Sequence, residues 1–106
     1  MKENPRRSTA FVEAMARLPW REYPGHFGGA LSKALVAPEN TGTSRVDFRI
    51  SRYAPAAYVE EHVHAVQEQI YYVLEGEGVL TTDGERHLMR PHDYVYVPPG
   101  VGHGFS

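Results

Sequence analysis

Apolar and polar residues alternate along several short stretches after residue 30, a pattern typical of β-strands with one covered face. Val46, Phe48 and Ile50 alternate with polar residues in the clearest of these stretches. Residues 70–74 are apolar on both faces, which predicts a strand that is covered on both sides. Further strands are expected over residues 30–37, 79–82, 86–89 and 94–97.

Turn-forming residues separate these stretches and indicate the fold class. Asp83-Gly84 predicts a two-residue hairpin turn between the strands on either side of it. Gly76 and Gly78 allow a bend or bulge after the doubly apolar strand. Short strands at regular spacing, with turn residues between them, are typical of an all-β sandwich or barrel.

The first 30 residues have a different pattern, and we expect them to form an N-terminal arm or short helix. Residues 1–7 are polar and predict a loose terminus. Ser8 or Thr9 is a candidate N-cap for a helix that ends at Leu18, before Pro19. Its apolar stripe would pack on the barrel or a partner subunit, and a frayed arm is the alternative. Residues 31–106 are then the barrel.

Length and composition narrow the functional classes. A chain of 106 residues is one domain by the usual size range. Its formal charge of -2 gives no electrostatic reason to expect nucleic acid or an anionic membrane as a partner. No apolar run approaches the about 20 residues that cross a bilayer, and the first residues lack a secretory signal, so a cytoplasmic location is the default.

Three histidines form the strongest candidate site. His62 and His64 lie in an extended context, so both imidazoles are expected on the same face of one strand. His103 follows the turn Pro98-Pro99-Gly100, which is suited to aim it back at this pair. The chain has no cysteine, so any metal must be held by imidazole, carboxylate or carboxamide groups. Three histidines with one oxygen donor would form a metal site with open positions.

These residues resemble the two conserved motifs of the cupins. His62-Val63-His64, then Gln69, then Gly76 is similar to the first motif, which is Gly, five residues, His-x-His, three or four residues, Glu, six residues, Gly. The stretch from Pro98 through Gly100 to His103 is similar to the second motif, which is Gly, five residues, Pro-x-Gly, two residues, His, three residues, Asn. The resemblance implies a cupin jelly-roll β-barrel with a divalent transition metal, such as Fe, Mn, Ni or Zn.

The sequence departs from the two motifs at three places. Ala57 stands near the start of the first motif, where no glycine occurs, and His92 replaces the glycine that opens the second. The sequence stops at Ser106, before the last residue of the second motif and before the strand that completes the barrel in the family. Because an unpaired edge favours pairing with another chain, we expect either truncation or association, with a homodimer as the minimum assembly.

The fourth ligand is ambiguous between two neighbours. Counting back from Gly76 selects Gln69, whereas counting forward from His64 selects Glu68. We prefer Gln69, which shares a strand face with Tyr71. Three imidazoles and a carboxamide are all neutral, so they leave a charge of about +2 on the ion and favour a carboxylate or enolate ligand. With Glu68 the charge would be closer to +1, which is more typical of oxygen-activating members.

Two tyrosines are candidate catalytic residues. Tyr71 shares its face with Gln69 and would serve as a hydrogen-bond donor or an acid/base group. Tyr96 would approach the site from the strand that precedes His103. Packing in the barrel wall is the alternative reading of both. Arg52 is a candidate clamp for a carboxylate. We expect His87 and His92 in solvent and His26 in a loop. We expect Trp20 and Tyr23 in the core or at an interface.

Two functions follow from the resemblance and the candidate site. The first is a metal-dependent enzyme that acts on a small oxygenated, carboxylate-bearing metabolite, by isomerisation or ring opening or by oxygenation. The second is a non-enzymatic module that binds a small molecule or the metal itself. The fold alone does not decide between them, because the cupin scaffold supports many chemistries.

Overall fold

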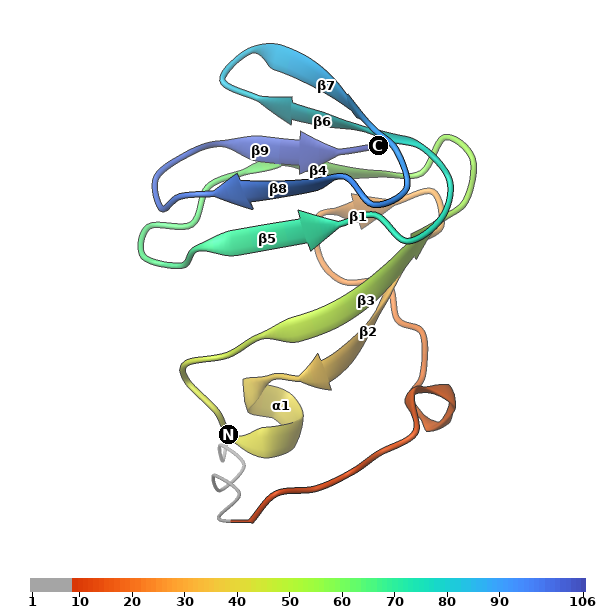
Figure 1. Ribbon diagram of the computed structural model, residues 1–106, viewed down its shortest axis with the longest axis vertical. Helices are drawn as coiled ribbons and strands as arrows, with labels where there is room; N and C mark the ends of the chain where they lie inside the picture. Colours follow the sequence, from red (N-terminus) through yellow and green to blue (C-terminus); the bar gives the residue numbers. More distant parts are fainter. Residues whose placement is uncertain (1–8) are drawn as a thin grey trace.

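Strands are the main regular structure of the protein in the computed structural model, which describes residues 9–106. There are nine strands, a four-residue α-helix and one turn of 3-10 helix in this part of the chain. Their bounds are η1 (Met15–Arg17), β1 (His26–Phe27), β2 (Ala30–Val36), α1 (Pro38–Thr41), β3 (Phe48–Tyr53), β4 (Tyr58–His62), β5 (Gln69–Tyr72), β6 (Gly78–Thr82), β7 (Glu85–Met89), β8 (Tyr94–Val97) and β9 (His103–Phe105). The prediction of an all-β jelly roll is confirmed (Figure 1).

One large sheet faces two smaller strand pairs. The large sheet has the strand order β1-β4-β9-β6-β7, and the other two sheets are the antiparallel pairs β2–β3 and β5–β8. Aromatic rings join the layers: Phe105 on β9 lies 5.3 Å from the Tyr53 ring on β3 and 5.9 Å from the Tyr71 ring on β5, measured between centroids. The inside of the jelly roll is therefore the space to which β3, β5 and β9 all turn one face.

The register of β5 with β8 assigns an inner and an outer face to this pair. Gln69 pairs with Val97 and Tyr71 pairs with Val95. Because directly paired residues of an antiparallel ladder project to the same side, these four side chains share the inner face. Val97 is buried and the other three are half-buried.

The outer face of β5–β8 carries four large apolar side chains. Ile70 pairs with Tyr96 and Tyr72 pairs with Tyr94, and these residues are between 51% and 72% exposed. The sequence predicted that this strand would be covered on both faces, and the structure corrects this: within the described residues only the inner face is covered. The apolar pattern identified the strand but could not reveal which face lacks a neighbour.

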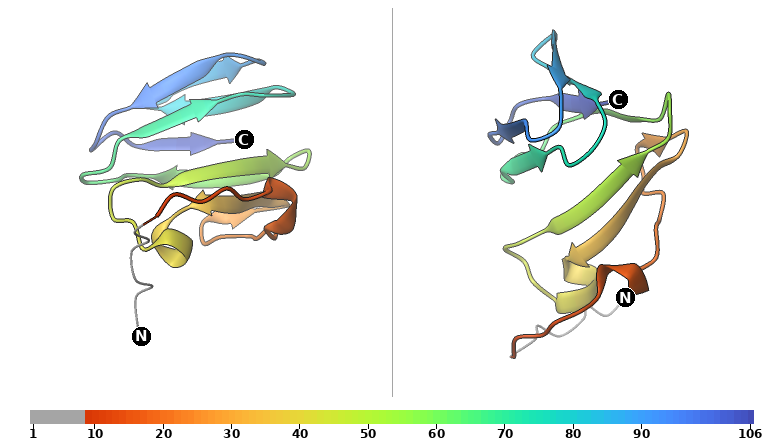
Figure 2. Two further views of the ribbon diagram at one scale, coloured as in Figure 1. Left: turned by 60° about the horizontal axis from the view of Figure 1, so that its bottom comes forward. Right: turned by 45° about the vertical axis from the view of Figure 1, so that its right-hand side comes forward.

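Alternation predicted β3 correctly, but its apolar residues lie on the unexpected face. Tyr53 points inward to Phe105, so Ser51 shares the inner face while Phe48 and Ile50 project outward. The outer face is partly covered by the N-terminal segment, whose backbone bridges to β2 through Arg21 (Figure 2).

The expected helix before Pro19 is wrong in its extent. Only Met15–Arg17 forms a 3-10 turn, and Ala14, at its N-terminus, offers no side-chain cap. Phe11 and Met15 are 42% and 43% exposed, so the predicted apolar stripe is only partly buried. A short helix without a cap or a buried face has little to stabilise it. The N-cap candidate Ser8 and the expected loose terminus lie outside the described residues.

Turn geometry explains the residues between strands. Asp83 and Gly84 have φ angles of 49° and 74°, which confirms the predicted hairpin turn. His92, which stands where the second motif opens with glycine, also has a positive φ of 70°. A histidine in this left-handed region is strained relative to glycine, so the motif's preference for glycine has a backbone cause.

The buried core is small, and the fold boundary expected at residue 31 stays a prediction. The most deeply buried apolar side chains include Ala30, Ala37, Ala57 and Leu80. Strands β1 and β2 begin before residue 31, so part of the expected arm belongs to the sheets. Among the described residues, no helix has the length and apolar character needed to span a membrane.

Candidate metal centre

Three histidines converge inside the jelly roll. His62 is the last residue of β4, His103 is the first residue of β9, and His64 follows in the loop after β4. One ligand atom from each ring can be chosen such that all three lie within 4.8 Å of one another. The His62 ring centroid is 4.3 Å from that of His103 and 4.9 Å from that of His64. The structure therefore brings the three predicted histidines together in a cluster that could hold a metal.

A bulge in β4 aims His62 at the cluster. Val59 pairs with Phe105 and His62 pairs with His103, so three steps along β4 correspond to two along β9. Strict alternation from the inward-facing Val59 would place residue 62 on the opposite face, and the extra residue reverses this. Gly104 allows the close approach of the two strands, since a Cβ there would lie 3.1 Å from the Val59 carbonyl oxygen.

Backbone carbonyls orient two of the rings. The Nδ1 atom of His62 is 2.8 Å from the carbonyl oxygen of Glu60, and that of His103 is 3.0 Å from the carbonyl oxygen of Val101. A carbonyl oxygen only accepts, so Nδ1 carries the proton in each ring and Nε2 keeps its lone pair. This is the arrangement by which metal-binding histidines are usually held.

Burial keeps His103 neutral. This side chain is almost fully buried, and burial lowers the pKa of His103 below its ordinary value. The neighbouring His62 and His64 lower this pKa further, against the raising effect of the Val101 carbonyl. A neutral imidazole is the form that binds a metal.

Gln69 lies at the cluster. Its Oε1 atom is 3.0 Å from Nε2 of His103. A carboxamide oxygen and an unprotonated Nε2 are both electron-pair donors, so a cation between them would make the contact favourable. With the amide nitrogen turned into this position, the contact is instead an ordinary hydrogen bond. In both arrangements Gln69 reaches the ring that is most buried, and its coordination of a metal stays a prediction.

Glu68 and Tyr96 lie on the other face of the strand pair. The Tyr96 hydroxyl donates a hydrogen bond to the Glu68 carboxylate, and both side chains are exposed. The structure therefore does not bring Tyr96, a predicted catalytic residue, to the histidines. The reason is parity: Tyr96 pairs with Ile70, whereas Gln69 pairs with Val97. The sequence could not predict which face Tyr96 occupies, because a loop separates β8 from His103.

Tyr71 lies on the inner face beside the cluster. Its ring centroid is 6.0 Å from that of His103, and the ring also stacks on Phe105. Burial raises the pKa of Tyr71 well above its ordinary value, and the nearby Tyr53 raises it further. The hydroxyl therefore keeps its proton at neutral pH, which suits a hydrogen-bond donor and not a base.

The predicted carboxylate clamp faces outward. Arg52 is stacked on the Trp20 ring, 4.5 Å from its centroid, on the side covered by the N-terminal segment. Arg49, which shares the inner face of β3, makes ion pairs with Asp47 and Glu39. Its charge is thus already compensated within the protein.

The sequence did not predict that two further polar residues, His26 and Thr82, lie near the cluster. His26, expected in a loop, lies in β1 beside Val59, and its Nδ1 atom is buried without a hydrogen-bond partner among the described residues. Burial lowers the pKa of His26, and His62 lowers it further. Thr82 pairs with His103 and donates a hydrogen bond to the Gly102 carbonyl. A two-residue strand is too short to show alternation, and a threonine in a strand gives no signal of its own.

Comparisons with known proteins identify the family of this fold and site. Residues 49–106 match the family described as "Cupin domain", and this range contains all four predicted ligands. The chain is 28% identical over 80 residues to the tetracenomycin polyketide synthase protein TcmJ of Streptomyces glaucescens, covering 76% of this chain and 54% of that protein. It is 27% identical over 79 residues to quercetin 2,3-dioxygenase of Bacillus subtilis, covering 74% of this chain and 23% of that protein.

A solved structure shows the same fold. The crystal structure of a predicted oxalate decarboxylase from Thermotoga maritima superimposes with a TM-score of 0.79 at 22% sequence identity, covering 91% of this chain and 86% of that one. The chain spans only about half or less of the curated relatives it matches. Because the family match includes more than half of the chain and both histidine motifs, the protein belongs to the cupin domain family.

Proposed function

We propose that this cupin binds one divalent transition metal and acts on a small oxygenated, carboxylate-bearing metabolite. His62, His64 and His103, with Gln69 as the fourth ligand, would hold the ion. The observation that carries the proposal is the convergence of three histidine ligand atoms within 4.8 Å of one another.

The donor set fits such an ion. Imidazole nitrogens suit iron, nickel and zinc, and a carboxamide oxygen also suits manganese. The backbone contacts of His62 and His103 engage Nδ1, so the metal would be bound through Nε2 of both rings. When bound, the ion would polarise substrate oxygens and lower the pKa of bound water.

The protein groups around the cluster have definable roles. Four neutral donors leave the positive charge of the ion uncompensated, so they favour an anionic substrate group such as a carboxylate. Tyr71, which keeps its proton, would donate a hydrogen bond to a substrate oxygen. The rings of Tyr53 and Phe105 pack beside Tyr71 and would exclude water from this side.

Two reaction classes remain within the proposal. The neutral donor set favours isomerisation or ring opening, in which charge and proton transfer suffice. Oxygenation is the other class, and the likeness to a quercetin 2,3-dioxygenase supports it. The sequence identity of 27% is too low to transfer that protein's reaction to this chain.

A paired assay tests the proposal. The protein is loaded anaerobically with Fe(II), and separately with Ni(II), Zn(II) or Mn(II), and mixed with a panel of sugar acids, keto acids and hydroxy acids. Oxygen consumption reports oxygenation, and proton NMR reports isomerisation or ring opening. We expect conversion of at least one compound by the loaded protein and none by metal-free protein. Stoichiometric metal without any conversion would favour a non-enzymatic binding module.

The proposal includes a homodimer in the cytoplasm. The support for the dimer is the outer face of β5–β8, where four large apolar side chains are more than half exposed. Burial of such a face is favourable at about 25 cal/mol per Å² of apolar surface. Light scattering tests the assembly, and cell fractionation tests the location.

A further inference from the structure

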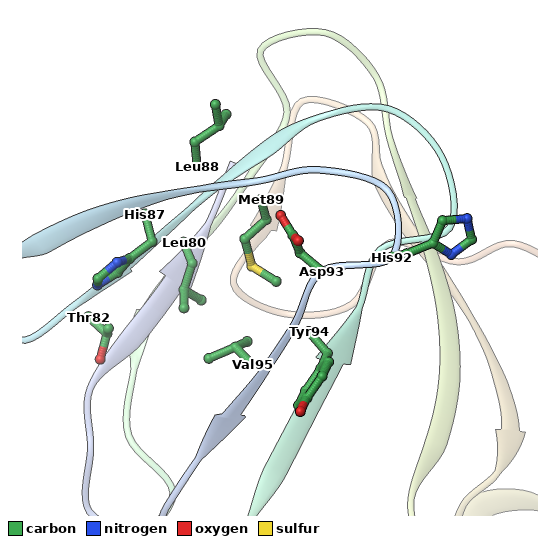
Figure 3. Close-up of a pocket in the computed structure, with 9 residues that line it drawn as sticks. All are labelled: Leu80, Thr82, His87, Leu88, Met89, His92, Asp93, Tyr94 and Val95. Carbon is green, nitrogen blue, oxygen red and sulfur yellow. The ribbon is translucent and has the colours of Figure 1, made fainter.

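A pocket of about 400 Å³ lies between the β6–β7 hairpin and β8, apart from the histidine cluster (Figure 3). Leu80 pairs with His87 across the hairpin, and Gly78 pairs with Met89, so these side chains point to the inner side of the sheet. Val95 faces them from β8. The pocket thus opens into the same interior as the cluster.

One residue adjoins both the pocket and the metal centre. Thr82 lines the pocket and is also the direct cross-strand partner of His103. Paired residues of an antiparallel ladder have Cα atoms about 4.5 to 5.5 Å apart. The Thr82 hydroxyl also donates a hydrogen bond, 2.9 Å long, to the carbonyl of Gly102, the residue before His103. A ligand in the pocket would therefore be separated from His103 by a single residue, Thr82.

The chemistry of the lining selects a ring with polar substituents. Leu80 and Met89 are buried and form an apolar floor together with Val95. A methionine thioether makes favourable contacts with aromatic rings. Polar groups mark the two ends: His87 beside Thr82 at one, and Asp93 at the other (Figure 3).

The size of the pocket agrees with this choice. An apolar cavity of roughly 150 Å³ is enough to hold benzene, so about 400 Å³ can accept a fused ring or a ring with substituents. We propose that this pocket receives an aromatic ring system belonging to the substrate whose oxygen atoms bind at the metal. The proposal rests on the function proposed above and extends it to a substrate class.

A pair of zinc-binding ligands that differ only in the group attached to the hydroxamate tests this. Acetohydroxamate and 2-naphthohydroxamate are titrated by calorimetry into zinc-loaded protein. We expect the naphthyl compound to bind at least about tenfold more tightly, because its ring buries apolar surface in the pocket. Equal affinities would overturn the proposal while leaving the metal site intact.

Two variants test whether the pocket causes the tighter binding of the naphthyl compound. Val95→Phe fills the pocket and should bring the ratio of the two affinities close to one. Val46→Phe makes the same change at an exposed valine outside the pocket and should keep the ratio of the wild type. A ratio unchanged in Val95→Phe would overturn the proposal.

A measurement on the unmodified protein covers the case in which Val95→Phe does not fold. Nuclear Overhauser effects between the naphthyl protons and the Met89 methyl group are expected in the zinc-loaded wild type. If zinc does not bind, the function proposed above fails, and the same contacts with metal-free protein then judge the pocket alone. Contacts only to Ile70 or Tyr96, which lie on the outer face and outside the pocket, with none to Met89, would overturn the proposal.

Discussion

The two faces of the β5–β8 pair are built from alternating residues of the same two strands, yet they differ in composition and surroundings. The inner face carries Gln69 and Tyr71, which lie beside His103. The outer face carries Ile70, Tyr72, Tyr94 and Tyr96, which are all more than half exposed. The inner face also carries Val95 and Val97, so it is apolar apart from Gln69 and the Tyr71 hydroxyl, as expected for a face that covers a core. The outer face differs from the usual arrangement, because it carries large apolar residues where polar ones are expected.

This difference separates two kinds of function. A half-buried carboxamide 3.0 Å from a buried imidazole is costly to maintain unless both groups have partners, which is consistent with a ligand site. A contiguous exposed apolar face indicates an interaction surface. In the function proposed above, this pair of strands would serve a small ligand on its inner side and a second copy of the chain on its outer side.

The largest expected effect comes from removing a histidine on the inner side. His64→Ala should lower zinc affinity at least about 100-fold, because one of four protein ligands is lost. Tyr94→Ala, on the outer face, is the matched control and should bind zinc like the wild type. Competition with a chromophoric chelator measures both, and circular dichroism checks that both fold. Wild-type affinity in His64→Ala would exclude this residue as a ligand.

Charges on the outer face should break the dimer. Replacing Ile70 and Tyr94 together by lysine would bury unpaired charge in the proposed interface, so the dimer should weaken by at least about tenfold. Light scattering at micromolar concentration should show a dimer for the wild type and a monomer for the variant. Zinc affinity should be unchanged, since neither residue faces the histidines. A wild type that is monomeric would contradict the assignment of the outer face.

Variants of the neighbours Gln69 and Glu68 test which face of β5 carries the fourth metal ligand. Gln69→Ala should weaken zinc binding by about tenfold, within the range for an oriented neutral ligand. Glu68→Ala should change it by less than about twofold, because its carboxylate is bound to the outward-facing Tyr96. The opposite ranking would mean that the fourth ligand is the glutamate.

Two tyrosines on opposite faces extend the comparison to substrate binding. Tyr71→Phe should weaken binding of oxalate to the zinc-loaded protein by about tenfold, the loss of one hydrogen bond to an anion. Tyr96→Phe should leave oxalate binding unaltered. Calorimetry measures both variants, and equal losses would remove Tyr71 from the site.

The smallest effect concerns pH. The pKa values of His26 and His103 are lowered in the folded protein, chiefly by burial. The unfolded chain, with ordinary pKa values of about 6.5, therefore binds more protons over the range just below that value. Stability of the metal-free protein is complete above the ordinary pKa and declines as pH falls through this range. Urea unfolding at pH 7.5 and 5.5 should show this decline, and His26→Gln should make it shallower; an increase in stability at pH 5.5 would contradict it.

The sequence predicted the strands and the histidine cluster because each has a local signal. Alternation indicated β3, and the Asp83-Gly84 pair indicated the β6–β7 hairpin. The motif spacing indicated His62 and His64 as a pair, although the structure shows that a bulge is needed to turn His62 inward. A bulge leaves no mark in the hydrophobic pattern, so this part of the geometry could not be predicted.

The features that the sequence did not predict depend on long-range contacts. The helix expected before Pro19 has a suitable pattern, but it lacks a side-chain cap and its apolar side is only partly covered. The position of Arg52 over Trp20 depends on the path of the N-terminal segment. The placement of Tyr96 depends on the register of β8 against β5, which local composition does not determine.

Metal stoichiometry tests the central claim most directly. Wild-type protein is reconstituted with Zn(II), desalted, and analysed by mass spectrometry for metal per chain, with the triple variant His62→Ala, His64→Ala and His103→Ala treated in parallel. The three histidine ligand atoms within 4.8 Å of one another predict close to one zinc ion per wild-type chain and none per variant chain. A wild-type chain that retains no metal, or a folded variant that retains as much as the wild type, would contradict the account.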